Sequence, residues 1–410
     1  MIIIGAGASG IAAAYEAIMQ NNQLNILVLE KEANPGRKLS AAGNGKCNVT
    51  NAFFKNSCYH TKTPSLVDSW IQTKDYQNVI GFFESAGILL YENEGYYYPV
   101  SNQGKQVTRI LVERCKNLGV TFQLQTKVID IKHTKKGYEV FVDTQENAYQ
   151  GSCVIVAMGG TVAPKLGGSQ DGYTILKRMG HSVQPTYSAL SPIYVKEKGL
   201  RLAKGVRLNA NVTLELPEYT VSEYGQVQFN ENSLSGIVVM NLSCYYNGLK
   251  KEQMEKRKLY LDVLPDYNWD EVYAYFIKQK EQFSTATMEL TLNALFPNPF
   301  VQYMMKELSI DKTMTLQQSS EKLLRKLVST IKKLSFTPVV FDDKDKSQVT
   351  GGGVSLTEVD LNTFESKQHK DLYITGELLD VTGKCGGYNI TFAVLSGIAA
   401  ARECVKRIQK

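Results

Sequence analysis

The sequence predicts an α/β protein whose parallel sheet takes strands from both ends of the chain, and three features carry this prediction. An apolar strand, a glycine-rich turn and a small-residue helix open the chain and lead into a second apolar strand. A strongly apolar segment lies farther along the chain, and a similar segment near the C-terminus is followed by a glycine turn and a helix. This order is typical of a doubly wound parallel sheet that is interrupted by an inserted unit.

The opening feature places each predicted element close to the next. Met1–Ile4 is a short apolar run that predicts a buried strand, and 10–21 has the small residues of a helix packed close to a sheet. Asn25–Leu29 forms the second apolar run, which ends at Glu30. Because the two strands are joined through a helix, we expect them to be parallel neighbours.

The glycines of this segment predict a site for a dinucleotide. Gly5, Gly7 and Gly10 form the pattern GxGxxG between the strand and the helix. Gly5 permits the tight turn, Gly7 lets the backbone approach a pyrophosphate, and Gly10 lets helix and sheet pack closely. The N-terminus of the helix offers free N–H groups to the phosphates. Glu30 ends the second strand, where its carboxylate can accept both ribose hydroxyls.

The loop after the second strand favours FAD over NAD(P). Residues 34–51 are glycine-rich and carry Arg37 and Lys38. Such a loop suits a ligand whose phosphate, ribityl chain and ring fold over it, although a mobile surface loop is the alternative. Farther on, the strand 154–157 runs into Met158-Gly159-Gly160, which resembles the ATGG turn of FAD-binding oxidoreductases. No second GxGxxG follows it, so no separate NAD(P)H domain is predicted.

The C-terminal part predicts the flavin end of the same site. The apolar segment 371–375 leads into Gly376, Glu377 and Asp380, then into Gly386–Ile390 and the small-residue helix 391–405. A helix N-terminus at this point would stabilise an anionic reduced flavin through its partial positive charge. Asp380 is the candidate partner of the ribityl chain, and a structural glycine turn is the alternative.

Composition sets limits on the other classes. The chain has 410 residues, of which 43% are hydrophobic, enough for one large core or several smaller ones. Its net charge of +6 suits an anionic ligand but is too diffuse to indicate nucleic acid. Seven cysteines without CxxC spacing and four dispersed histidines favour reduced thiols and no metal. The chain shows no secretory signal and no membrane-spanning run, so we expect a soluble, cytoplasmic protein.

Three blocks of the sequence resemble the aminoacetone oxidase family of FAD-binding enzymes, a bacterial flavoprotein family that also includes BaiN-like NAD(P)/FAD-dependent oxidoreductases. The blocks are GRKLSAAGNGKCNVTN, TGGGVSLTEVD and GELLDVTGKCGGYNITFAVLSG. The middle block GQVQFNENSLSG is similar but departs from the family's usual threonine, glycine and proline pattern. The resemblance extends over essentially the whole chain.

This resemblance implies a three-part architecture. A discontinuous Rossmann-like FAD-binding domain would comprise 1–184 and 351–410. A β-barrel-like insert, the substrate domain, would comprise 185–250 and 334–350, and a helical unit over 251–333 would be nested within it. Carried over by matching position, the FAD contacts would be Gly5, Gly7, Ser9, Gly10, Glu30, Lys31, Arg37, Lys38, Ser40, Asn48, Val128, Gly159, Asp171, Gly376, Asp380, Gly387, Asn389 and Ile390.

Three functions remain open at this level. The first is an oxidase that converts a small primary amine, such as aminoacetone, to methylglyoxal, ammonia and hydrogen peroxide, with oxygen as acceptor. The second is an NAD(P)H-dependent reductase of an enone-type substrate. The third is a flavoprotein that binds nucleic acid through the lysine-rich segment 251–333. We expect the first, with a small-molecule substrate, no nucleic acid, no membrane and an undetermined oligomeric state.

No residue is identified as catalytic by its pattern. Tyr96-Tyr97-Tyr98 and Tyr388 could flank a flavin and hold an ammonium by cation–π attraction, although an ordinary strand or turn explains the first three equally well. Cys47 could contact the flavin or simply pack in the core. Lys46 and Lys384 could polarise the ring edge, or be ordinary surface lysines.

Overall fold

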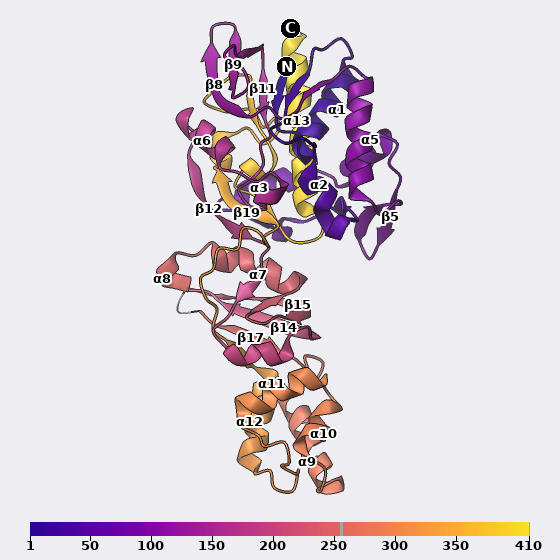
Figure 1. Ribbon diagram of the computed structural model, residues 1–410, viewed down its shortest axis with the longest axis vertical. Helices are drawn as coiled ribbons and strands as arrows, with labels where there is room; N and C mark the ends of the chain where they lie inside the picture. Colours follow the sequence, from indigo (N-terminus) through magenta and orange to yellow (C-terminus); the bar gives the residue numbers. More distant parts are fainter. Residues whose placement is uncertain (255–256, 410) are drawn as a thin grey trace. The chain divides into compact units, whose positions relative to one another are not determined.

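The computed structural model describes residues 1–254 and 257–409, and the chain divides into two compact units (Figure 1). Unit 1 comprises Met1–Ser188 and Ser347–Lys410, and unit 2 comprises Ala189–Lys346. Glu255, Lys256 and Lys410 fall within two of the expected domain ranges but lie outside the described residues. Each unit is described here by itself.

Unit 1 is built on a parallel sheet that both ends of the chain complete. Its strands are β1 (Ile2–Ile4), β2 (Leu27–Leu29), β7 (Thr121–Gln123), β11 (Val154–Val156) and β20 (Leu372–Ile374). They lie in the order β20-β11-β1-β2-β7, and every neighbouring pair is parallel. The C-terminal strand β20 pairs with β11, with Val154 opposite Leu372. The α/β class and the discontinuous Rossmann-like sheet are therefore confirmed.

Helices α1 (Ala8–Gln20) and α13 (Tyr388–Ile408) pack side by side in this unit, next to α5 (Gly104–Asn117) (Figure 1). Their close approach depends on small residues. A Cβ on Gly397 of α13 would lie 2.2 Å from the carbonyl oxygen of Ser9 in α1. The sequence signal for a small-residue helix at each end of the chain thus reflects a contact between those two helices.

Shorter elements complete unit 1. Its remaining helices are α2 (Arg37–Ala41), α3 (Pro64–Gln72), α4 (Gln77–Ser85) and α6 (Asp171–Arg178). Antiparallel pairing joins β10 (Tyr149–Gly151), β9 (Gly137–Val142) and β8 (Val128–Thr134), and also β3 (Thr50–Asn51), β6 (Tyr96–Pro99) and β5 (Leu90–Asn93). Two further pairs are β12 (Val183–Ala189) with β19 (Val349–Val354), and β21 (Thr382–Gly383) with β4 (Tyr59–His60).

One cysteine pair differs from the sequence prediction. Cys153, directly before β11, and Cys404, in the last turns of α13, form a disulfide with a Cα–Cα distance of 6.7 Å. The expectation that all cysteines are reduced is therefore wrong for this pair. Their separation of 251 positions hides the pairing in the sequence, because only the discontinuous fold brings the two segments together.

Unit 2 is built on an antiparallel sheet that curls into a barrel. Its strands are β13 (Ile193–Tyr194), β14 (Arg207–Glu215), β15 (Thr220–Phe229), β16 (Ser233–Ser235), β17 (Leu259–Asp262) and β18 (Leu334–Phe336). They lie in the order β13-β16-β15-β14-β17-β18. An antiparallel bridge between Val195 and Pro338 joins the segments that follow the two outer strands, β13 and β18, and so closes the barrel.

The helices of unit 2 share one core with this barrel. They are α7 (Ile237–Asn247), α8 (Lys251–Met254), α9 (Trp269–Gln282), α10 (Met288–Asn293), α11 (Asn298–Leu308) and α12 (Glu321–Lys332). Phe300 of α11 packs against Phe229 of the barrel at a ring distance of 5.2 Å. Strand β17 falls inside the range 251–333 that was expected to be helical. The hydrophobic residues of 251–333 and those of the strands belong to one cluster. A helical unit over 251–333 that is separate from the barrel therefore remains a proposal.

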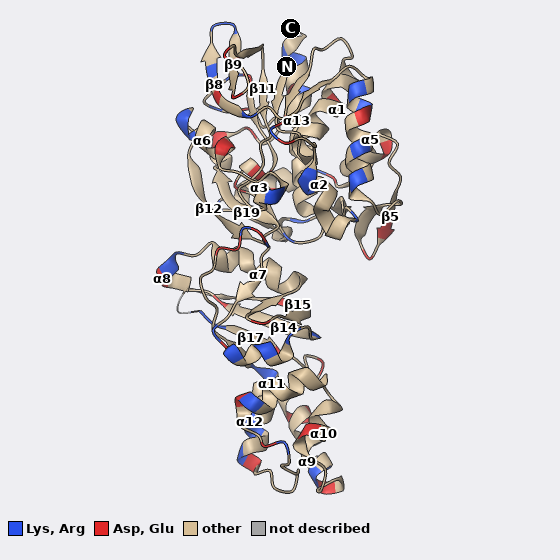
Figure 2. Cartoon of the chain, in the orientation of Figure 1, with Lys and Arg blue, Asp and Glu red and all other residues tan. Residues whose placement is uncertain are grey.

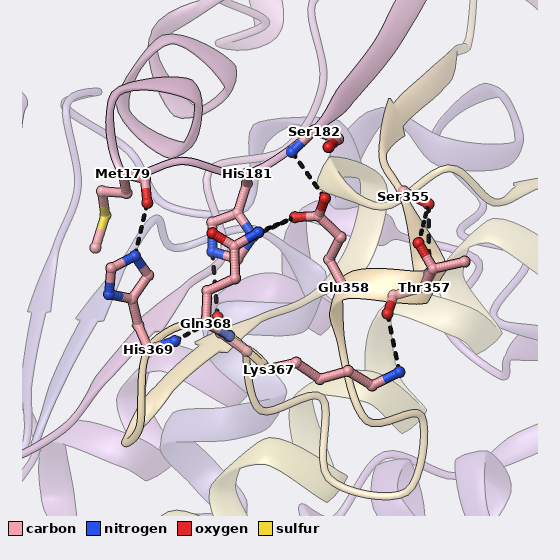
Figure 3. Close-up of polar contacts among 10 residues, drawn as sticks. Met179, His181, Ser182, Ser355, Thr357, Glu358, Lys367, Gln368 and His369 are labelled. Carbon is pink, nitrogen blue, oxygen red and sulfur yellow. Dashed lines mark hydrogen bonds and ion pairs between the residues drawn. The ribbon is translucent and has the colours of Figure 1, made fainter.

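A polar network joins the end of α6 to the segment between β19 and β20 (Figure 3). His181 Nδ1 lies 2.9 Å from Glu358 Oε2, and His181 Nε2 lies 3.2 Å from Ser366 Oγ. The Ser366 hydroxyl oxygen accepts the backbone N–H groups of Gln368 and His369. Its own hydrogen is therefore available for Nε2, and we infer a neutral imidazole with its hydrogen on Nδ1.

Acid should destabilise the protein through His181. Burial lowers the pKa of His181, and the hydrogen bond with Glu358 opposes this only in part. The unfolded chain then binds the proton more readily. Stability that is present above about pH 6.5 is therefore lost as the pH falls below it, by at most about 1.4 kcal/mol per pH unit.

Urea unfolding at about pH 7.5 and about pH 5.5 measures this loss. The wild type should lose more stability on acidification than His181→Asn, which has no imidazole to charge. His133→Asn, at an exposed position, is the matched control and should keep the wild-type difference. An equal loss in wild type and His181→Asn would rule the explanation out.

Candidate cofactor site

A cleft lies at the carboxyl ends of strands β1, β2 and β11. This edge of an open parallel sheet is where such folds bind their ligands. The cleft is lined by Ile4, Gly5, Ala6, Gly7, Leu29, Glu30, Lys31, Glu32, Asn34, Gly36, Arg37, Lys38, Thr126, Lys127, Val128, Ala157, Met158, Gly159, Gly160, Leu166, Gly167, Gly168 and Ser169.

The glycines of the first turn have the geometry that a phosphate cradle requires. Gly5 has a φ of +100°, and a Cβ there would lie 2.4 Å from the carbonyl oxygen of Ala157. A Cβ on Gly10 would lie 1.9 Å from the carbonyl oxygen of Gly5, whereas Gly7 has nothing within 4 Å on that side. Gly7 precedes α1, and no side chain caps this helix. The N-terminus of α1 is thus open to an anionic group.

Glu30 lines the same cleft next to the glycine turn and is 9% exposed. Its two oxygens accept backbone N–H groups from Ala6, at 2.7 Å, and from Glu32, at 2.9 Å. These bonds fix the carboxylate against the glycine turn and leave each oxygen with a second lone pair. A ribose diol could donate to this pair of acceptors. Glu30 therefore remains the candidate residue for binding the ribose.

The predicted residues fall into two groups. Those that line the cleft are Gly5, Gly7, Glu30, Lys31, Arg37, Lys38, Val128 and Gly159. Those that lie outside its lining are Ser9, Gly10, Ser40, Asn48, Asp171, Gly376, Asp380, Gly387, Asn389 and Ile390. Several of the second group surround the N-terminus of α13, which lies in the same unit.

The N-terminus of α13 has the features expected of the flavin end. Gly387 precedes the helix with a φ of +90°, and no side chain caps the helix. Asn48 is buried, and neither its Nδ2 nor its Oδ1 has a hydrogen-bond partner. A Cβ on Gly387 would lie 2.1 Å from this Oδ1. An unpaired buried amide beside an open helix end fits the polar edge of a flavin, so the residues present fit FAD.

Replacing Asn48 with leucine should change stability and cofactor affinity in opposite directions. A buried amide without partners costs about 1–3 kcal/mol, so its removal should leave the FAD-free protein as stable as the wild type or more stable. The affinity for FAD should fall about tenfold or more, because the ligand would lose its partner. Thermal unfolding of FAD-free protein and a fluorescence titration with FAD measure the two effects.

Asn389→Leu is the matched control for stability, because both the oxygen and the nitrogen of its amide have protein partners. Asn389 Oδ1 accepts the N–H of Gly383 at 2.8 Å, and its Nδ2 donates to the Gly383 carbonyl at 2.8 Å. Its loss should lower the stability of the FAD-free protein. If Asn48→Leu behaves in the same way and keeps its FAD affinity, Asn48 has a structural role only.

Three other predicted residues have protein partners in the structure. Asp380 is 4% exposed and accepts the N–H of Lys62 at 3.0 Å, and burial raises its pKa. Ser40 donates to Thr108 of α5 at 2.9 Å. Asp171 opens α6 and pairs with Lys127 at 3.0 Å. Since Lys127 lines the cleft, Asp171 is one contact away from it.

Two residues that the sequence did not single out for a role join the site. Glu377 pairs with Lys38, and Thr350 accepts backbone N–H groups from Thr161 and Val162 at 2.8 and 3.3 Å. Thr350 belongs to the glycine-rich block TGGGV, which was recognisable in the sequence. Only the pairing of distant segments shows that this block borders the cleft turn at 158–160.

The candidate catalytic groups have ordinary structural environments. Tyr388 donates to the carbonyl of Phe53 at 3.2 Å, and burial raises the pKa of its hydroxyl. Tyr96 lies beside the turn before α13, since a Cβ on Gly386 would be 2.9 Å from its ring. Burial raises the pKa of the Cys47 thiol to about 12, which fits a packing role. Lys46 is exposed and is outside the cleft lining.

The described part of the chain shows neither a cluster of metal-binding side chains nor a helix that could span a membrane. Within 1–254 and 257–409, no three acidic, histidine or cysteine side chains are grouped so that they could hold a metal ion. Over the same residues, no helix combines the length and the apolar character that crossing a membrane requires.

The chain matches one protein family and two known proteins over nearly its full length. The family described as HI0933-like protein Rossmann domain matches residues 1–403. The chain is 32% identical over 407 residues to the 3-dehydro-bile acid delta(4,6)-reductase of Clostridium scindens, which covers 99% of this chain and 98% of the relative. It is 30% identical over 405 residues to the ribosomal RNA dihydrouridine synthase of Haemophilus influenzae, covering 98% and 97%.

A solved structure with the same fold is the 3-ketosteroid delta1-dehydrogenase of Sterolibacterium denitrificans. The TM-score is 0.51 at 12% identity, with 99% of each chain covered. The resemblance drawn from the sequence blocks is thus confirmed for an FAD-dependent Rossmann family of BaiN-like flavoproteins, while the assignment to the aminoacetone oxidases stays a prediction. The chain belongs to the HI0933-like Rossmann family and is an FAD-dependent oxidoreductase.

Proposed function

We propose that this protein is a reductase that uses FAD to add hydrogen across a carbon–carbon double bond conjugated to a carbonyl group. The observation that carries this proposal is a reaction type shared by two relatives that match almost the whole chain. A 3-dehydro-bile acid with delta(4,6) unsaturation has its double bonds conjugated to the 3-oxo group. Uridine has its C5–C6 double bond conjugated to the C4 carbonyl.

The chemistry of both substrates makes the same demands on the protein. A hydride must reach the carbon of the reduced double bond that is farther from the carbonyl, and a proton must reach the nearer one. Bound FAD, once reduced by NAD(P)H, would supply the hydride. The protein must hold the cofactor, which the cleft and the open N-termini of α1 and α13 favour, and must stabilise negative charge on the reduced ring. The absence of a second GxGxxG in the sequence is compatible with transient binding of NAD(P)H.

An oxidase of a small primary amine is the second candidate. The three sequence blocks that resemble aminoacetone oxidases favour it, and it would use oxygen as acceptor and release hydrogen peroxide. The two candidates differ in the direction of electron transfer between substrate and flavin. An amine reduces the flavin, whereas a conjugated double bond oxidises it.

The double bond belongs either to a free small molecule or to a uracil in RNA, and the experiment below distinguishes these two substrates. The lysine-rich helical part of unit 2 gives no separate argument for RNA, because Figure 2 shows acidic residues among the basic ones on α9 and α12. Arg325 of α12, for example, pairs with Glu321 at 2.8 Å.

Product analysis tests the proposal. The FAD-loaded protein is incubated anaerobically with NADH or NADPH and one acceptor at a time, and mass spectrometry then looks for the gain of two hydrogens. The acceptors are a 3-oxo-4,6-diene bile acid, a uridine-containing ribosomal RNA fragment and free uridine. We expect reduction of at least one of them. No reduction of any acceptor, combined with peroxide formation from aminoacetone in air, would replace the reductase by the oxidase.

A further inference from the structure

An ion pair between two distant parts of the chain lies at the edge of the cleft. Lys38 Nζ is 2.7 Å from Glu377 Oε2 and 2.9 Å from Oε1, although the two residues are 339 positions apart. Their side chains are 27% and 20% exposed, so the pair is mostly shielded from solvent. Lys38 itself lines the cleft.

The backbone of other segments fixes the carboxylate of Glu377. The N–H of Thr350 donates to Oε1 at 2.8 Å, and the hydroxyl of Tyr173 donates to the backbone carbonyl of Glu377 at 2.9 Å. Gly160, which lines the cleft, passes so close that a Cβ there would lie 2.4 Å from Oε1. The carboxylate thus has a defined place, and it in turn sets the place of the Lys38 ammonium group.

The position of Glu377 links the cleft to helices α1 and α13. Gly376, the preceding residue, has a φ of +65°, and a Cβ there would lie 2.8 Å from Ser9 Oγ in α1 and 3.7 Å from Ala393 Cβ in α13. Lys38, at the other end of the ion pair, shares the cleft with Glu30. A cofactor that extends from Glu30 toward α13 therefore has this ion pair beside it.

We propose that Glu377 is a positioning residue that holds Lys38 beside FAD and, by neutralising its charge, keeps the flavin reduction potential low. Reduction of a flavin to its anionic form adds negative charge to the ring. A lone lysine would favour this step, and a lone carboxylate would oppose it. The pair contributes neither charge in full, so the reduced flavin remains a strong hydride donor. This inference depends on FAD binding and not on the identity of the substrate.

The test compares single and double charge variants of the FAD-loaded protein by anaerobic reductive titration against reference dyes. Glu377→Gln keeps an acceptor for Lys38 and Thr350 but removes the negative charge. It should raise the preference for reduced over oxidised FAD about tenfold, equivalent to about 30 mV for a two-electron couple. Lys38→Gln should lower this preference about tenfold. The double variant should return to within about twofold of the wild type.

The opposite signs and their cancellation separate a charge effect from a structural effect. Glu377→Asp, which keeps the charge, should stay closer to the wild type than Glu377→Gln. Shifts of both single variants in the same direction, or shifts of less than about twofold, would overturn the proposal. If Glu377→Gln loses its FAD, the other two variants test the proposal. It requires that Lys38→Gln lower the flavin reduction potential and that Glu377→Asp leave it nearly unchanged.

Discussion

Gly10→Ala should abolish FAD retention and lower the stability of the protein. The new Cβ would lie 1.9 Å from the carbonyl oxygen of Gly5 and 3.3 Å from the Cβ of Ala157. The carbonyl oxygen of Gly5 belongs to the backbone and the Cβ of Ala157 is fixed to it, so neither atom can rotate away and α1 must move off the sheet. Overpacking of this kind costs about 1–3 kcal/mol or more. The displacement also removes the N-terminus of α1 from the phosphates, so affinity for FAD should fall by more than about 100-fold.

Thermal unfolding and the FAD content of the purified protein measure these effects. Gly81→Ala is the matched control, since Gly81 lies inside helix α4 and a Cβ there meets nothing within 4 Å. It should stabilise the protein by about 1 kcal/mol, because alanine is the better helix former. A Gly10→Ala protein as stable and as yellow as Gly81→Ala would show that the contact between α1 and the first turn has been misjudged.

Glu30→Ala should produce the second large effect, a loss of FAD affinity of about 100-fold or more. Each hydrogen bond from a ribose hydroxyl to a carboxylate contributes about 1.5–3 kcal/mol. The substitution also leaves the N–H groups of Ala6 and Glu32 without their acceptor, which loosens the turn. Equilibrium titration of FAD-free protein with FAD measures the affinity.

Two further variants separate the ribose contact from the turn. Glu30→Gln keeps an acceptor oxygen for one of the two N–H groups of the turn and offers the ribose a weaker, neutral partner, so its affinity should fall between the wild type and Glu30→Ala. Glu113→Ala, on an exposed face of α5, should bind FAD as the wild type does. Unchanged cofactor content in Glu30→Ala would remove Glu30 from the ribose site.

The parallel sheet and its first turn could be predicted because local sequence determines them. Met1–Ile4 and 371–375 are short apolar runs next to glycine turns. Runs of this kind are typical of buried parallel strands. Gly10 is likewise required by a contact within the turn, with the carbonyl oxygen of Gly5, whereas the close contact of Gly5 is with the backbone of the distant residue Ala157.

The features that could not be predicted all depend on distant segments meeting. The Cys153–Cys404 disulfide, the Lys38–Glu377 ion pair and the His181 network each join positions far apart in the chain. Strand β17 was missed for a related reason. Its four residues, Leu259–Asp262, lie in a lysine-rich segment, and their strand character comes from pairing with β14 and β18.

The candidate site was predicted in parts and is assembled by the fold. The glycine turn and Glu30 follow one another in the sequence, so their proximity was expected. Asn48 was assigned by resemblance, and Gly387 by resemblance and by its place in a glycine turn before a helix. The structure adds a physical reason for each, an unpaired amide and a left-handed turn. Their contact with FAD stays a prediction until the variants above are measured.

The direction of electron flow between flavin and substrate tests the central proposal most directly. The FAD-loaded protein is reduced photochemically without oxygen and mixed with the 3-oxo-4,6-diene bile acid or with the ribosomal RNA fragment. A reductase should recover its yellow absorbance with at least one of them, and aminoacetone should leave the oxidised protein yellow. Reduced flavin that stays colourless with every conjugated acceptor, while aminoacetone bleaches the oxidised flavin, would contradict the reductase assignment.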